Sequence, residues 1–154
     1  MASSPLMSMS VRGVAGVRHR LEELAGRAGN PRAVWPLIIK ELTDMEKARF
    51  DSSGFGSWPK LADSTIEWKK RLGQDSNHIL YVTGALERSL TSLRGPGAVR
   101  TTTNEGIRFG TSVFYARFHQ YAKRLPRRRL LDTDLALRAR ITKILERYIV
   151  GHGA

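Results

Sequence analysis

Three long stretches of the chain repeat apolar residues at intervals of three and four, which places those residues on one side of an α-helix. We predict helices over residues 13–28, over residues 34–50, and from Thr133 or Asp134 to Tyr148. The apolar side of the first helix is formed by Val14, Val17, Leu21 and Leu24. Because the connection between the first two helices is short, we expect them to be antiparallel neighbours.

Two shorter helices are predicted in the middle of the chain. One begins at the capping cluster 63–65 and ends at Gly73, and the other covers residues 85–90. The apolar run 79–82 between them fits either a strand or a buried turn. The residues before the first of these helices, from Asp51, are rich in glycine and serine and indicate a loop.

The period of the hydrophobic pattern changes to two residues between residues 99 and 109, where apolar and polar positions alternate. Residues 104–106 interrupt the alternation, and Gly106 can supply the positive φ that a tight turn needs. We therefore predict a β-hairpin. An isolated hairpin is marginally stable in water, so the sheet needs a further strand, which residues 7–12 or 79–82 could supply.

Aromatic residues crowd the segment that follows the hairpin. Thr111 and Ser112 can cap a helix of about ten residues there, and Pro126 ends it. Together the elements predict an α+β fold, with a small antiparallel sheet, helices packed against one of its faces, an N-terminal helical pair and a C-terminal helix. The length of 154 residues fits one domain, 1–154, in which residues 1–10 are flexible and residues 151–154 fray.

The composition excludes several classes of protein. The chain has no cysteine, so disulfide scaffolds, thiolate zinc sites, iron–sulfur clusters and cysteine nucleophiles are ruled out. No stretch approaches the roughly 20 apolar residues that span a bilayer. We therefore predict neither a membrane segment nor a signal peptide.

Positive charge is the strongest compositional feature. The chain has 26 Lys and Arg residues against 14 Asp and Glu residues, a net charge of +12. Residues 117–154 hold +7 of it, in part through the run Arg127, Arg128 and Arg129. Such a run fits a solvated face, a nucleic-acid contact or a contact with carboxylates on a neighbouring subunit. A basic DNA-binding accessory protein is therefore one hypothesis.

Catalytic constellations are missing from the pattern. The four histidines lie on different predicted elements without the spacing of metal ligands, and none pairs with Glu or Asp in a recognised motif. The Gly-rich sequences that bind phosphates are also absent. We therefore assign no catalytic residue, expect no cofactor and no metal, and predict that the chain is not an enzyme.

Two aromatic residues, Phe55 and Trp58, interrupt the polar loop after the second helix. Large aromatics in such a loop either pack against a core or dock against another chain, where Trp and Phe are favoured anchors. We take Phe55 and Trp58 as one candidate contact surface, and Arg127, Arg128 and Arg129 as a second.

Several short segments, taken in order, resemble the phage virion morphogenesis family, also called the tail completion family. Its patterns are a W-x-x-L loop followed by T, an I-L-x-x-T-G-x-L segment, a strand ending in G-T, a Y-A-x-x-H-Q helix and a P-x-R segment. The matching positions here are Phe50, 58–61, Thr65, Lys69, 79–86, 109–111, Tyr115, Ala116, 119–121 and 126–128. One departure is Ala122, where the family has glycine.

This resemblance implies a structural virion protein at the head–tail junction. In such a protein a ring of identical subunits, six by the resemblance, completes or terminates the tail and permits head joining. The expected partners are copies of the chain, the neighbouring connector proteins and the tail tube proteins, with DNA passing through the ring. The expected location is the neck of the virion, and the host cytoplasm before assembly. A DNA channel lined with arginine would grip phosphates, so we expect residues 127–129 mostly outside the pore.

Overall fold

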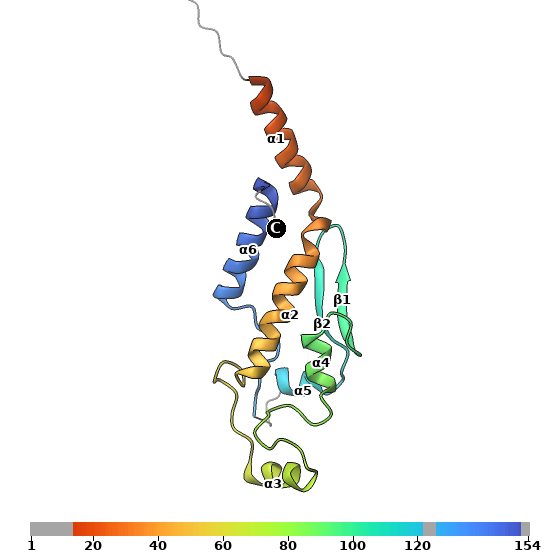
Figure 1. Ribbon diagram of the computed structural model, residues 1–154, viewed down its shortest axis with the longest axis vertical. Coiled ribbons are helices and arrows are strands. Elements are labelled where there is room, and N and C mark those ends of the chain that lie inside the picture. Colours follow the sequence, from red (N-terminus) through yellow and green to blue (C-terminus); the bar gives the residue numbers. More distant parts are fainter. Residues whose placement is uncertain (1–13, 122–125, 152–154) are drawn as a thin grey trace, which may run out of the picture.

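The computed structural model describes residues 14–121 and 126–151 (Figure 1). In chain order the elements are α1 (Val14–Gly29), a 3₁₀ turn η1 (Pro31–Ala33), α2 (Trp35–Asp51), α3 (Asp63–Arg71), α4 (Ala85–Thr91), β1 (Ala98–Thr102), β2 (Ile107–Thr111), α5 (Ala116–Tyr121) and α6 (Leu135–Val150). The predicted α+β class is confirmed. The predictions for residues 1–10 and 152–154 lie outside the described residues.

Helix α2 is the central element, with α6 along one side and the hairpin along another (Figure 1). Val34, Trp35 and Ile38 form an apolar cluster at its N-terminal end, and the helical period of α6 supplies the residues that pack against it. The Trp35 indole Nε1 donates a hydrogen bond of 2.8 Å to the carbonyl of Thr103, which ties α2 to the hairpin turn. Within the described residues, no helix is long and apolar enough to cross a membrane.

Helix α1 departs from the prediction. It extends beyond the N-terminal end of α2 instead of folding back along it (Figure 1), so the antiparallel pairing was wrong. The reason is the connection, because η1 forms a single 3₁₀ turn that carries the chain onward without reversing it. In the described part, α1 packs against α6, where Arg27 donates to the carbonyl of Ile149. The apolar residues Val17 and Leu21 are therefore exposed.

The predicted hairpin is confirmed, with antiparallel strands in register from Ala98 opposite Thr111 to Thr102 opposite Ile107. Its turn does not use a positive φ at Gly106. Instead the hydroxyl of Thr103 accepts hydrogen bonds from the backbone N–H groups that follow it.

No third strand accompanies this hairpin within the described residues. Residues 79–82 form a turn, in which Leu80 has φ 62°, so they are not a strand. Residues 7–12, the other candidate for a third strand, lie outside the described residues. Helix α4 packs against both strands.

The remaining helices follow their local signals to different degrees. Helix α6 begins as predicted, since the Asp134 carboxylate accepts a 2.7 Å hydrogen bond from the Leu137 N–H. Helix α3 is also present, although its N-cap is Ala62 and not a residue of the capping cluster. Helix α5 is shorter than the ten residues predicted, and Ala122 lies outside the described residues.

A second apolar cluster joins the far end of α2 to α4 and α5. Its buried members are Phe50, Trp58, Ile79, Leu86, Leu90, Ala116 and Leu130. Trp58 meets Phe50 edge to face, with ring centroids 5.3 Å apart. Gly54 must be a glycine, because a Cβ atom there would lie 2.3 Å from the Trp58 ring.

Arg100 on β1 holds the hairpin to α4. Its guanidinium donates to the carbonyls of Val99 and Gly110 on the hairpin, and to those of Ser89, Leu90 and Ser92 at the end of α4. It also lies 3.7 Å from the centroid of the Phe109 ring. Carbonyls at a helix C-terminus have no partner in the helix, so one cation here satisfies and neutralises that end of α4.

Glu46 on α2 is fully buried, and its Oε1 lies 3.3 Å from Nε of Arg49. Neither carboxylate oxygen accepts a hydrogen bond from the described residues. Burial raises the pKa of Glu46 to about 7, against the opposing attraction of Arg49 and Arg100.

This shift predicts a pH-dependent difference between the wild-type protein and a Glu46→Gln variant. Between the usual pKa of 4.5 and about 7, the folded chain binds a proton at Glu46 that the unfolded chain has lost. The contribution of Glu46 to stability therefore falls as the pH rises through this range. From pH 5 to pH 8, the unfolding free energy of Glu46→Gln should improve relative to wild type by about 2 to 3 kcal/mol.

Urea unfolding of both proteins at pH 5, 6, 7 and 8 measures this difference. Glu105→Gln is the matched control, because Glu105 is exposed in the hairpin turn, and its difference from wild type should stay constant. Parallel stability profiles for wild type and Glu46→Gln would contradict the prediction.

Candidate functional site

Most of the segments that carry the family resemblance contribute residues to the lining of one cavity. This cavity, of about 740 Å³, lies among α3, the residues before it, the loop 80–84, α5 and the segment 126–128. We call it the α3 groove. The residues that line it are Lys60, Leu61, Ala62, Thr65, Trp68, Lys69, Leu80, Tyr81, Val82, Thr83, Gly84, Tyr115, His119, Pro126 and Arg128.

Two sets of hydrogen bonds join parts of the chain that are about seventy residues apart. The Trp58 indole Nε1 donates a 3.0 Å hydrogen bond to the carbonyl of Arg129. In return, Arg128 donates from Nε and Nη2 to the carbonyl of Pro59, at 3.1 and 2.8 Å, and from Nη2 to that of Lys60 at 3.1 Å. We call this arrangement the clamp. It joins residues 58–60 to residues 128–129, and Lys60 and Arg128 both line the groove.

The clamp places two of the predicted contact residues inside the chain. Trp58 is 6% exposed and Arg128 is 7% exposed. The W-x-x-L and P-x-R patterns therefore meet each other in this fold, and the tryptophan packs in the core. Neither side chain forms an exposed contact surface in this structure.

The other three predicted contact residues are on the surface. Phe55 is 55% exposed in the loop after α2. Arg127 donates through Nε to the carbonyl of Gln120, and Arg129 forms an exposed ion pair of 3.2 Å with Asp132. These contacts leave the three side chains accessible, and they remain candidates for contact with a partner.

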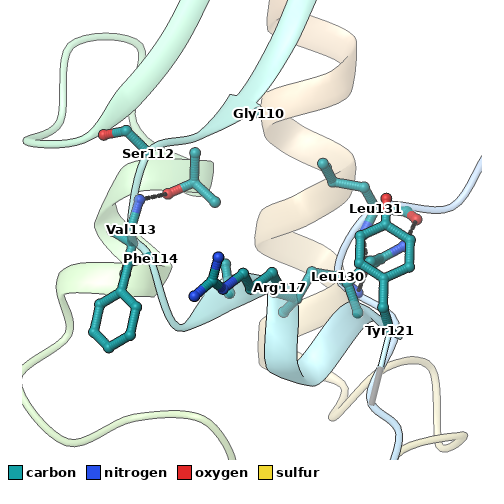
Figure 2. A pocket seen from close by; sticks show the side chains of 11 residues that line it. Gly110, Ser112, Val113, Phe114, Arg117, Tyr121, Leu130 and Leu131 are labelled. Atoms are coloured by element: carbon teal, nitrogen blue, oxygen red, sulfur yellow. Dashed lines mark hydrogen bonds between the residues drawn. The ribbon is translucent and has the colours of Figure 1, made fainter. Parts of the chain in front are cut away.

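Gln120 on α5 fixes the segment after the arginines. Its Oε1 accepts hydrogen bonds from the N–H groups of Leu130 and Leu131, and its Nε2 donates to the Leu131 carbonyl. These contacts border a smaller cavity of about 360 Å³ between the end of β2 and α5, shown in Figure 2. Phe114 and Tyr121, labelled at its margins, are largely exposed.

The α3 groove contains buried cations. Lys69 is 2% exposed, and its ammonium donates a hydrogen bond to the carbonyl of His78. Burial lowers the pKa of Lys69, with a smaller opposing effect of Asp75. Burial likewise lowers the pKa of Arg128. The pKa of His119 is lowered by burial and by the charge of Arg128, so His119 is neutral at pH 7.

Apolar side chains are exposed next to these cations. Trp68 and Val82 both line the groove and are 45% and 43% exposed, and Leu72, the residue directly after α3, is exposed as well. The other two tryptophans, Trp35 and Trp58, are buried. Trp68 is thus the tryptophan whose fluorescence will report on the groove.

The sequence did not single out Lys69 and Trp68 as site residues. Lys69 was part of the quoted family pattern, but a lysine in a polar helix ordinarily extends into solvent. In the structure its ammonium instead turns inward to the carbonyl of His78, in the segment that follows α3. Trp68 carried no signal of exposure, because the short helix α3 has no apolar side long enough to define which face is buried.

Titratable groups outside the groove include a close histidine–glutamate pair. His78 and Glu87 approach to 3.1 Å, and the His78 ring stacks on Tyr81 with centroids 4.6 Å apart. Among residues 14–121 and 126–151, no group of three or more acidic or histidine side chains is placed to hold a metal ion.

Comparison with known proteins agrees with the family resemblance of the segments around the groove. The model of the phage virion morphogenesis family matches residues 13–150. No curated protein and no solved structure matches the chain significantly. The family match spans all the elements described above, including the clamp and the α3 groove. The chain therefore belongs to the phage virion morphogenesis family, and its role is in the assembly of a phage virion.

Proposed function

We propose that the protein is a structural, non-enzymatic component of the head–tail junction. In this proposal identical subunits, six by family resemblance, form a ring that completes or terminates the tail and permits the head to join. The observation that carries the proposal is the family match over residues 13–150. The neighbours of the ring are the connector proteins and the tail tube, and DNA passes through its centre.

A closed ring needs two different surfaces on each subunit that complement each other. The chain offers separate exposed surfaces of this kind. The apolar residues Val17 and Leu21 lie on α1, at the opposite end of the long axis from α3 (Figure 1). Phe55 and the exposed arginines Arg127 and Arg129 lie on other parts of the fold. These surfaces support contacts of the heterologous type that ring closure requires.

The buried position of Arg128 also favours this proposal over a DNA-binding accessory protein. A phosphate-binding face would use several neighbouring guanidinium groups. Here the middle arginine of the run donates to backbone carbonyls within the chain, and Arg129 is paired with Asp132. The run therefore does not present three free cations to a duplex.

Particles assembled without the protein test the proposed position. We expect full heads and tails that are separate, or tails of abnormal length, in negative-stain images. Addition of purified protein should restore joined particles. Joined, infectious particles formed in its absence would contradict the proposal.

Phe55→Ser tests the contact surface within the ring. We expect at least a tenfold loss in the yield of joined particles, because an exposed aromatic anchor is removed, while the thermal unfolding midpoint stays near that of wild type. Leu93→Ser is the matched control, since Leu93 is also 55% exposed but lies outside the predicted surfaces. Equal yields from Phe55→Ser and wild type would exclude Phe55 from the interface.

A further inference from the structure

The α3 groove buries positive charge without a counterion. Lys69 and Arg128 are both more than nine-tenths buried, and neither forms an ion pair with any described residue. Every one of the 14 acidic residues lies within the described parts of the chain. The undescribed segments therefore cannot supply the missing acidic side chain.

Burial of a cation without an anion is costly, and proteins ordinarily offset the cost with a carboxylate or phosphate. The described residues accept hydrogen bonds from only some of the donors on these two cations. Lys69 uses one hydrogen bond to the His78 carbonyl, which leaves two N–H donors of its ammonium. Arg128 directs Nε and Nη2 toward the clamp, and its Nη1 makes no hydrogen bond to the described residues. Donors of both side chains that no described residue uses are thus placed for an anionic group that enters the groove.

The rest of the lining is suited to apolar side chains. Leu61, Leu80 and Tyr115 contribute apolar surface inside the groove, and Trp68 and Val82 leave apolar surface exposed at it. A volume of about 740 Å³ is large enough for several side chains of a peptide. The occupant must therefore combine apolar groups with negative charge.

We propose that the α3 groove binds an acidic amphipathic segment of another protein. The apolar side chains of that segment contact Trp68 and Val82, and one of its carboxylates binds between Lys69 and Arg128. Charge complementarity selects this occupant, because the lining contains cations and no carboxylate. The assignment of the segment to a neighbouring virion protein rests on the proposed function, whereas the chemistry of the segment does not.

Two other occupants fit less well. Duplex DNA presents its phosphates along a broad, rigid surface, and the Lys69 and Arg128 groups are too deeply buried to meet them. A second copy of the chain has a net charge of +12, so it is a poor source of an acidic segment. An acidic segment of a different protein is attracted by the same charge.

Selection from a random library of 12-residue peptides tests the proposal with the full-length protein. We expect the recovered peptides to be enriched in Asp or Glu beside aromatic or aliphatic residues. They should change Trp68 fluorescence in wild type, and this change should disappear in Trp68→Phe. Replacement of each acidic residue in a recovered peptide by its amide should weaken binding at least tenfold.

Adjacent lysines on α3 provide the decisive comparison. Lys69→Met should lower peptide affinity at least tenfold, whereas Lys70→Met should bind like wild type, because Lys70 is exposed and outside the groove. If Lys69→Met fails to fold, Val82→Glu serves instead, since it places a carboxylate at the exposed part of the groove. Its control is Leu93→Glu.

The outcomes are distinct. Recovered peptides without acidic enrichment, or equal affinity for Lys69→Met and wild type, would overturn the proposal. A change in Trp68 fluorescence on addition of a 20-base-pair duplex would identify DNA as the occupant of the groove instead. Self-association that Lys69→Met abolishes would identify a second copy of the chain. The ring proposal fails separately, if particles join without the protein.

Discussion

Replacing Arg100 by methionine is expected to destabilise the protein by about 4 kcal/mol, a large part of the total stability of a domain of this size. The substitution removes the donor that serves five backbone carbonyls in the hairpin and at the end of α4. Methionine fills much of the same volume but cannot donate a hydrogen bond to any of these carbonyls. It also removes the cation that lies over the Phe109 ring.

Urea unfolding monitored by circular dichroism measures this loss. Arg100→Lys should recover less than half of it, since an ammonium cannot reach carbonyls on two elements in the planar geometry of a guanidinium. Arg108→Met is the control, because Arg108 is an exposed residue of β2, and the change should be within about 0.5 kcal/mol of wild type. A loss below about 1 kcal/mol for Arg100→Met would show that water replaces these contacts.

Trp58→Ala is expected to cost about 4 kcal/mol, in the range found when a large aromatic side chain is removed from a core. The substitution leaves a cavity beside Phe50 and removes the hydrogen bond to the Arg129 carbonyl. It therefore breaks one half of the clamp. Any assembly defect of this variant would follow from unfolding, and would not identify Trp58 as an interface residue.

Thermal and urea unfolding test this prediction, and two variants separate its causes. Trp58→Phe keeps an aromatic ring but loses the indole donor, so it should cost about 1 to 2 kcal/mol. Trp68→Ala removes the same side chain from an exposed position and should cost about 1 kcal/mol or less. Unfolding of Trp58→Ala at the wild-type urea concentration would refute the core assignment.

The long helices and the hairpin could be predicted from the sequence because each is specified by local patterns. A helical repeat marks α2 and α6, an aspartate caps α6, and alternation marks the two strands. The repeat also predicted α1, but a repeat shows which side of a helix is apolar and not what covers it. The direction of α1 relative to α2 depends on η1. The sequence of this single turn does not show whether the chain continues in the same direction or reverses.

The candidate site was harder to predict, because its residues act through partners that are distant in sequence. From the sequence alone, Trp58 could either pack in a core or dock against another chain. In the structure it is buried, and its indole donates to the carbonyl of Arg129, 71 positions later. A run of arginines indicates solvent exposure, yet Arg128 finds its acceptors at Pro59 and Lys60. Charge and periodicity contain no information on such acceptors.

The clamp has a consequence for how the protein moves. It closes the chain between Lys60 and Arg128 into a loop whose two ends are fastened together, and this loop contains both sides of the α3 groove. Widening of the groove cannot start at the fastened ends without breaking buried hydrogen bonds. Separation of α3 from the segment that leads into the 80–84 loop also breaks a hydrogen bond, the one from the Lys69 ammonium to the His78 carbonyl.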